Sequence, residues 1–108
     1  MTPEHKLMNQ VRLECSKRGY VVIRMNVFKG ILIDPNGNDR YMDSGIPEGF
    51  PDLMVLRSDG KACFVETKIH PRKPTKIQLQ RQELLRSLGY RAGTAYTVDE
   101  AMEIIEKD

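Results

Sequence analysis

Two apolar runs separated by a short polar turn constrain the fold of this 108-residue chain more than any other feature. Residues 52–56 form the first run, residues 61–68 form the second, and the turn between them ends at Gly60. This pattern predicts a β-hairpin. With Gly60 in the left-handed conformation, the loop spans residues 58–60 and the ladder pairs Asp52 with Glu66.

The length of this loop decides whether two acidic side chains meet. In the odd-length register, Asp52 and Glu66 share one face of the sheet, with Cβ atoms about 4.5–5.5 Å apart. Two carboxylates at that separation repel each other, and burying them is costly unless a cation compensates. A two-residue turn would pair Asp52 with Thr67 instead and separate the acids. The loop that Gly60 permits therefore predicts a cation between the two strands.

The residue types in these strands suit Mg²⁺ chemistry. Mg²⁺ prefers hard oxygen ligands and is usually held by one or two carboxylates together with water and substrate phosphate. Asp52 and Glu66 supply the carboxylates, and the backbone carbonyl of Thr67 is a third candidate ligand. Strand alternation places Lys68 on the face of Glu66, where its ammonium group can orient an attacking water and stabilise negative charge. The alternative is an ordinary surface ion pair between Glu66 and Lys68, which would contribute at most about 1 kcal/mol.

The N-terminal half predicts a helix, a strand and a loop. Thr2 is an N-cap residue type, and the apolar residues that follow it recur at helical spacing. Residues 20–28 are rich in β-branched and aromatic types and predict a strand. Glycine and proline recur through residues 30–49, which predicts a loop with room for one short strand near Ile31 or Tyr41.

The C-terminal half predicts two helices separated by a short strand. Thr75 with Gln78, and Thr97 with Glu100, have the spacing of capping boxes. The strand between the two helices is predicted over residues 92–96. The resulting order, α-β-(β)-β-β-α-β-α, predicts the α/β class with a mixed β-sheet flanked by helices. A chain of this length has room for one hydrophobic core.

Composition excludes several classes of protein. An apolar share of 40% and a charged share of 30% are those of an ordinary globular domain. No apolar run approaches the roughly 20 residues of a membrane-spanning helix, and the polar N-terminus lacks the apolar stretch of a signal peptide. Cys15 and Cys63 share no metal-binding spacing, so we expect buried free thiols in a reducing cytoplasm.

Basic residues gather directly after the second run of the hairpin. They should lie beside the metal and contact phosphates, which positions a nucleic acid without reading its sequence. The candidates there and elsewhere are Arg24, Lys29, Arg40, His70, Arg72, Lys73 and Lys76. A net charge of +2 does not by itself indicate a nucleic-acid partner, and a solvated loop is the alternative interpretation of the cluster.

Short motifs along the chain resemble one family of nucleases. Pro51-Asp52 followed by Glu66-Thr67-Lys68 resembles the PD-(D/E)xK signature, and Gly49-Phe50-Pro51-Asp52 resembles the G-x-P/S-D turn of its VRR-NUC branch. Further segments that resemble this branch are Gly19-Tyr20, Arg24, Asn26 and Thr97-Val98-Asp99-Glu100-Ala101. On this resemblance we expect residues 1–108 to form a single VRR-NUC-like domain of the stand-alone phage or bacterial type, with a restriction-endonuclease-like core.

The resemblance implies a role for each site residue. Asp52 and Glu66 would bind Mg²⁺ or Mn²⁺, and Lys68 would be the catalytic lysine. Glu4 would support the metal site or a second ion, although it could instead only complement the helix dipole. Gln78 would complete the pocket. The alternatives are Glu14 in place of Glu4, and Gln80 or Gln82 in place of Gln78.

The resemblance also implies a function. Stand-alone members of this family are homodimers that cut branched DNA, so we expect a structure-selective endonuclease similar to Holliday-junction resolvases, acting in replication, repair or recombination. Its location would be the cytoplasm of a bacterial cell or of a phage-infected host. Two alternatives remain: a non-catalytic DNA-binding module, and a nuclease subunit that is active only within a larger assembly. The first predicts salt-sensitive DNA binding that needs no metal.

Overall fold

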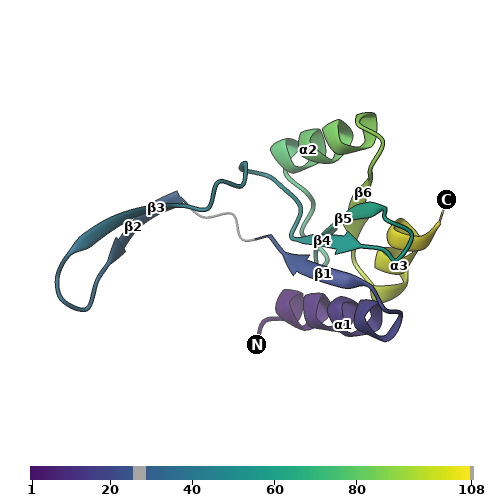
Figure 1. Cartoon of the computed structure of the whole chain (residues 1–108), viewed down its shortest axis with the longest axis horizontal. Helices are drawn as coiled ribbons and strands as arrows, with labels where there is room; N and C mark the ends of the chain where they lie inside the picture. The colour runs from purple at the N-terminus through teal and green to yellow at the C-terminus, as the bar shows by residue number, and fades with distance from the viewer. Residues whose placement is uncertain (26–28, 108) are drawn as a thin grey trace.

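The computed structural model describes residues 1–25 and 29–107. Its helices and strands are α1 (Pro3–Lys17), β1 (Val21–Arg24), β2 (Lys29–Ile33), β3 (Asp39–Asp43), β4 (Leu53–Leu56), β5 (Ala62–Thr67), α2 (Lys76–Ser87), β6 (Arg91–Ala95) and α3 (Val98–Glu106). Four strands form a central sheet in the order β1-β4-β5-β6, and β2 and β3 form a separate two-stranded sheet. Figure 1 shows the central sheet between the helices, with the β2–β3 hairpin extending away from it. The predicted mixed sheet flanked by helices is confirmed.

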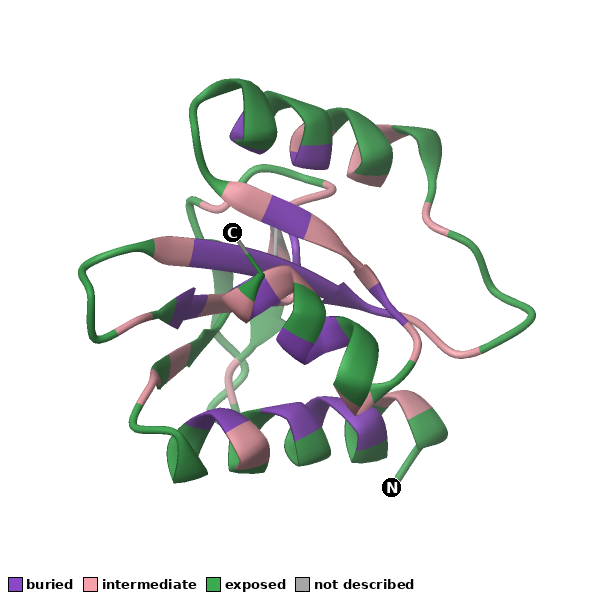
Figure 2. Cartoon of the chain, turned by 90° about the vertical axis from the view of Figure 1, so that its right-hand side faces the viewer, coloured by how far each residue is buried: buried purple, intermediate pink, exposed green. Residues whose placement is uncertain are grey.

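The two faces of the central sheet are covered by different helices (Figure 2). Leu53 and Val65 belong to a buried cluster with residues of α1 and α3. Phe64 packs on the other face against Leu85 of α2. Because successive side chains of a strand point to opposite faces, the even-numbered residues of β4 and β5 face the layer of α2. Asp52 and Glu66 have this parity.

The hairpin of β4 and β5 has the predicted register. Leu53 pairs with Val65 in an antiparallel ladder, and the pairing continues without interruption to the turn. The Arg57 N–H donates to the Lys61 carbonyl at 2.9 Å. Gly60 has a φ of +84°, the left-handed conformation that closes an odd-length loop.

All three predicted N-caps are present. The Thr2 hydroxyl accepts a hydrogen bond from the His5 N–H at 3.2 Å and begins α1. Thr75 and Gln78 form the complete capping box of α2. At α3, Thr97 accepts from the Glu100 N–H, but the Glu100 carboxylate accepts from the backbone N–H of Tyr96 rather than from the cap residue itself.

Two predictions for the segment between β1 and β4 need correction. The strand predicted over residues 20–28 is observed only as Val21–Arg24, and residues 26–28, including Asn26, lie outside the described part of the chain. The predicted loop with one short strand contains two strands, which pair antiparallel with Ile31 opposite Tyr41. We call this hairpin, residues 29–43, the arm.

Two smaller expectations concern thiols and membranes. Cys15 and Cys63 are buried and free, as predicted. Within residues 1–25 and 29–107, no helix has the length and apolar character needed to cross a bilayer.

Candidate metal and nucleic-acid site

Asp52 and Glu66 lie next to each other on the face of the sheet that α2 covers. Asp52 precedes the first residue of β4, and Glu66 is the penultimate residue of β5. The last observed pair of the ladder, Leu53 with Val65, brings the two acidic residues to adjacent positions at the end of the hairpin. The charge of Asp52 acts on Glu66 strongly enough to raise its pKa. The predicted register, which brings the two acidic residues to neighbouring positions on one face, is therefore confirmed.

Asp52 is fixed by the neighbouring strands. Its Oδ2 atom accepts hydrogen bonds from the backbone N–H and the hydroxyl of Thr67, at 3.0 and 2.9 Å. Its backbone carbonyl accepts from the Met25 N–H at 2.7 Å, which ties the segment to the end of β1. The carboxylate is therefore held at one oxygen and remains half-buried.

Glu66 is the most strongly perturbed acid of the site. Its side chain is almost entirely buried, with 2% of the residue exposed. Burial first, and then the negative charge of Asp52, raise the pKa of Glu66 to about 8, although the Lys68 ammonium group and the backbone N–H of Asp52 oppose this shift. One carboxylate oxygen, Oε2, is buried and has no hydrogen-bond partner among the described residues. A buried carboxylate oxygen in this state is the atom that a bound cation would satisfy.

Lys68 approaches the same carboxylate from the end of β5. Its Nζ atom lies 3.7 Å from Glu66 Oε1, which is an ion-pair contact rather than a close hydrogen bond. The Lys68 side chain is 12% exposed, so the interaction is shielded from water. Its backbone N–H donates to the Ala95 carbonyl of β6 at 3.0 Å, which fixes the chain where the strand ends.

Gln78 connects the start of α2 to the site. Its side-chain carbonyl accepts from the Thr75 N–H at 2.9 Å and closes the capping box. Its amide nitrogen donates to Glu66 Oε1 at 3.2 Å. One side chain therefore stabilises the first turn of the helix and contacts the acid, so the capping role of Gln78 does not exclude a role at the site.

The two other glutamines of α2 occupy different places. Gln80 is exposed to solvent. Gln82 is buried one turn beyond Gln78, and its amide nitrogen donates to the Thr94 hydroxyl at 2.8 Å. Thr94 is the β6 partner of Glu66 in the parallel ladder. Gln82 therefore binds the strand next to Glu66. Of the three glutamines, only Gln78 has an observed hydrogen bond to Glu66 itself.

Glu4 reaches the edge of the site from α1, on the opposite side of the sheet. It is half-buried and lines a cavity of about 330 Å³ together with Ile69, His70 and Arg72. Its charge makes the smallest of the contributions that raise the pKa of Glu66. The alternative acid, Glu14, is occupied by Arg18 in an ion pair of 3.0 Å one turn along the same helix. Of the two acids of α1, Glu4 is the one placed near Glu66.

The predicted basic residues divide into two groups. His70, Arg72, Lys73 and Lys76 are exposed in the segment that leads from Lys68 to α2. Arg24 is exposed at the end of β1, where its Nη2 atom lies 3.3 Å from a ring nitrogen of His5. Lys29 and Arg40 belong to the arm; Arg40 is exposed, and the side chain of Lys29 lies outside the described part of the chain. The first group follows Lys68 directly in the chain, whereas Arg40 lies in β3, which extends away from the central sheet (Figure 1).

Sequence reasoning missed two residues that shape this surface. The Tyr96 ring stacks on the His70 ring with centroids 4.0 Å apart, and its hydroxyl donates to the Arg72 carbonyl at 2.9 Å. Arg81 of α2 donates to the Glu48 carbonyl at 3.0 Å and so anchors the segment before Asp52. The signal for Tyr96 was its position at the end of the last strand, which runs parallel to the strand of Glu66.

The donor set fits a small divalent cation. Asp52 and Glu66 offer carboxylate oxygens, and the buried Oε2 of Glu66 lacks another partner among the described residues. Within residues 1–25 and 29–107, no group of three or more His, Cys, Asp or Glu side chains is placed to hold a metal. Mg²⁺ needs only one or two protein carboxylates, because water, backbone carbonyls and substrate phosphates complete its shell.

Two solved structures share the fold over almost its whole length. One, described as "VRR_NUC domain", superimposes with a TM-score of 0.70 at 22% identity, covering 99% of this chain and 98% of the other. A second, described as "VRR_NUC domain protein", has a TM-score of 0.62 at 20% identity and covers 99% of this chain and 88% of the other. No family model and no curated protein matches the sequence. The resemblance noted in the sequence is therefore confirmed at the level of the fold.

Proposed function

We propose that this chain, whose fold is the nuclease-type fold of VRR_NUC domains, is a metal-dependent DNA endonuclease that hydrolyses phosphodiester bonds. The observation that carries the proposal is the buried pair of acids with a lysine beside them. Glu66 retains an unpartnered buried oxygen next to Asp52 and 3.7 Å from Lys68 Nζ. If these buried positions served only the stability of the fold, apolar residues of similar volume would stabilise the protein more than the charged ones do.

Each residue of the site has a distinct task in this proposal. Asp52 and Glu66 would hold Mg²⁺ or Mn²⁺, with the Thr67 carbonyl as a third candidate ligand. The ion would neutralise charge on the phosphate and lower the pKa of a bound water. Lys68 donates hydrogen bonds that orient the attacking water and stabilise the negative charge that develops on the phosphate. Gln78 holds the Glu66 carboxylate in place, and Glu4 supports the site from α1.

The exposed basic segment supports DNA as the substrate. Four side chains, those of His70, Arg72, Lys73 and Lys76, follow Lys68 directly and are exposed to solvent. Contacts of this kind bind the phosphate backbone and give no base recognition. We therefore propose selection by DNA structure, with branched or four-way junctions as substrates in replication, repair or recombination. A symmetric junction requires two cuts, and a homodimer with one site in each subunit would supply them.

The location that we propose is a reducing cytoplasm. Two buried free cysteines are compatible with such a compartment, because disulfides are rare in cytosolic proteins.

The deciding experiment is a cleavage assay with four-way junction, flap and linear duplex DNA in the presence of Mg²⁺, Mn²⁺ or EDTA. We expect cleavage of the branched substrates with either metal and none with EDTA. Lys68→Ala should abolish cleavage while DNA binding persists, and Asp52→Ala should also weaken metal binding. Lys17→Ala changes an exposed lysine in the last turn of α1 and serves as the matched control.

The outcomes separate the alternatives. Unchanged cutting by Lys68→Ala or Asp52→Ala would reject the proposed site. DNA binding that is insensitive to metal, without cleavage under any condition, would instead support a non-catalytic DNA-binding module. Activity that appears only after a partner protein is added would support a subunit of a larger assembly.

A further inference from the structure

The arm exposes apolar side chains on both of its faces. Ile31, Ile33 and Tyr41 are 66%, 79% and 65% exposed, and the pairing of Ile31 with Tyr41 places these three residues on one face. Leu32 and Met42 are exposed on the opposite face. A two-stranded hairpin without further covering is marginally stable in water. The arm therefore has the character of a surface that a partner covers.

The edge of the central sheet exposes a second apolar surface. β1 is an edge strand, and its pairing with β4 places Val21 opposite Leu56 on the face of α2. Both residues are exposed, and so is Ile23 beside them. The Met25 N–H donates to the Asp52 carbonyl, so the alternation of an antiparallel ladder leaves the backbone groups of Val22 pointing away from β4. An unpaired strand edge of this kind readily accepts another strand.

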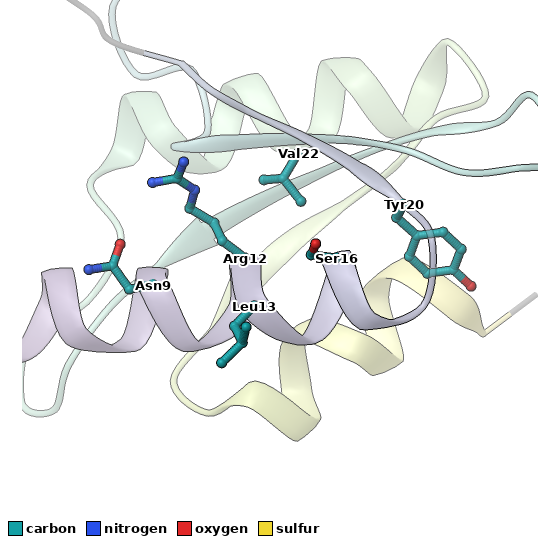
Figure 3. Close-up of a pocket in the computed structure, with 6 residues that line it drawn as sticks. All are labelled: Asn9, Arg12, Leu13, Ser16, Tyr20 and Val22. Carbon is teal, nitrogen blue, oxygen red and sulfur yellow. The ribbon is translucent and has the colours of Figure 1, made fainter.

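The other side of the same strand edge is hollowed. A groove of about 330 Å³ lies between α1 and β1 and is lined by Asn9, Arg12, Leu13, Ser16, Tyr20 and Val22. Figure 3 shows Arg12 extending from α1 toward β1, beside Val22. We call this groove, together with Val21, Ile23 and Leu56, the β1 edge surface. It combines apolar contacts, strand hydrogen-bonding groups and one cation.

The charges of the arm favour a protein partner over a nucleic acid. Residues 29–43 contain two basic and three acidic side chains, whereas the rest of the chain contains fifteen basic and twelve acidic ones. A surface that binds phosphates gathers positive charge, and the arm does not. The excess negative charge of the arm complements Arg12, the cation of the β1 edge surface.

We propose that the arm docks on the β1 edge surface of a second copy of this chain, so that two copies exchange arms around a two-fold axis. One chain carries both complementary surfaces, and Figure 1 shows the arm extending away from the central sheet of its own copy. A two-fold exchange pairs each arm with the β1 edge of the other copy. This inference rests on the homodimer proposed above and names the surfaces that form it.

The exchange would also set the distance between the two sites. The arm leaves the central sheet after β1 and returns to it at the segment that carries Asp52. Docking of the arm on the partner would therefore hold the acidic residues of the two copies at a fixed separation. Paired cuts in a branched substrate require such a separation.

Mixing of two variants tests the proposal. Two variants, Ile33→Lys and Ile31→Lys, alter the arm, and Val21→Glu alters the β1 edge surface. The control is Leu88→Lys, because Leu88 is an exposed leucine just beyond the C-terminal end of α2. Molar mass is measured by light scattering over a range of concentrations, without DNA or metal. The wild type and the control should have twice the 12.4 kDa mass of one chain. Each arm or edge variant should dissociate at least about tenfold more readily.

An equimolar mixture of the Ile33→Lys and Val21→Glu variants should form a heterodimer, because one of its two exchanged contacts is unaltered. Circular dichroism confirms that each variant is folded. A monomeric wild type, unchanged dimers in both arm variants, or loss of the dimer in Leu88→Lys alone would overturn the proposal. In a separate binding assay with a four-way junction, loss of DNA binding by arm variants that remain dimeric would also overturn the proposal and would assign the arm to DNA. Because the mass measurement contains neither DNA nor metal, its failure is distinct from failure of the proposed nuclease activity.

Discussion

Replacing Glu66 by glutamine separates the proposed role of the carboxylate in metal binding from its effect on the free energy of unfolding. The side chain is buried, its Oε2 atom has no partner among the described residues, and Asp52 lies beside it. Burial first, and then the Asp52 charge, raise the pKa of Glu66 from its ordinary value of 4.5 to about 8. Glutamine has nearly the same shape and carries no charge. We therefore expect Glu66→Gln to stabilise the metal-free protein near and above pH 8.

The size of the effect follows from proton binding. A raised pKa means that the folded state holds this proton more tightly than the unfolded state does. The stabilisation is complete below about pH 4.5 and is lost as the pH rises through about 8. One proton gives a slope of about 1.4 kcal/mol per pH unit, so Glu66 should lower the free energy of unfolding by about 3–5 kcal/mol across this window. Glu66→Gln should not show this loss of stability, because glutamine does not titrate.

Urea unfolding followed by circular dichroism, from pH 5 to 8.5 in EDTA, measures the difference. The wild type should lose stability with rising pH relative to Glu66→Gln, while Glu83→Gln, an exposed position on α2, should follow the wild type. Mg²⁺ at 100 times its dissociation constant should then add about 2.7 kcal/mol to the wild type at pH 8 and far less to the variant. Parallel pH curves for the wild type and Glu66→Gln would refute the burial argument. Equal stabilisation by Mg²⁺ would refute metal binding by Glu66.

Three further predictions concern the surroundings of the acids. Gln78→Ala should slow cleavage and lower the free energy of unfolding by about 1 kcal/mol, because it removes both the capping box and the contact to Glu66, whereas Gln80→Ala should leave both measurements unchanged. Gly49→Ala should destabilise the protein in thermal unfolding, because Gly49 has a φ of +80° and a Cβ atom there would lie 3.0 Å from Ile77 side-chain atoms. Gly37→Ala has a similar φ with nothing within 4 Å, so the difference between the two variants isolates the contact with α2. Binding of a four-way junction in EDTA should weaken steeply with salt, in proportion to the number of phosphates contacted; a flat salt dependence would contradict phosphate binding.

The sequence predicted the hairpin and its acids because local chemistry controls them. Gly60 permits the left-handed turn, the turn sets the register, and the register alone brings Asp52 opposite Glu66. The helix starts were predictable for the same reason, since an N-cap depends on residues three positions apart. Where two or three neighbouring residues decide the geometry, the pattern and the structure agree.

The arm was missed although its turn signal is present in the sequence. Asn36-Gly37 is a common turn dipeptide, and Gly37 has a φ of +83° between β2 and β3. The surrounding glycines and prolines suggested a loop. A hairpin that does not pack on the core lacks the alternation of apolar and polar residues by which a strand is predicted from sequence. The choice of Gln78 over Gln80 or Gln82 was likewise beyond the sequence, since it depends on how α2 is rotated over the sheet.

Under the proposed function, folding stability and metal binding make opposite demands on Glu66. A fold selected for stability alone would not place a carboxylate at 2% exposure beside another acid, with one oxygen unpartnered and its ammonium contact as far away as 3.7 Å. The neighbouring residues fix the unfavourable geometry instead of relieving it. Thr67 holds Asp52 through two hydrogen bonds, and the capping box directs the Gln78 amide toward Glu66. Interactions that hold two acids side by side are explained when a cation completes the arrangement, because the cation allows both carboxylates to be ionised, and this is why the acids support the proposed site more than the basic segment does.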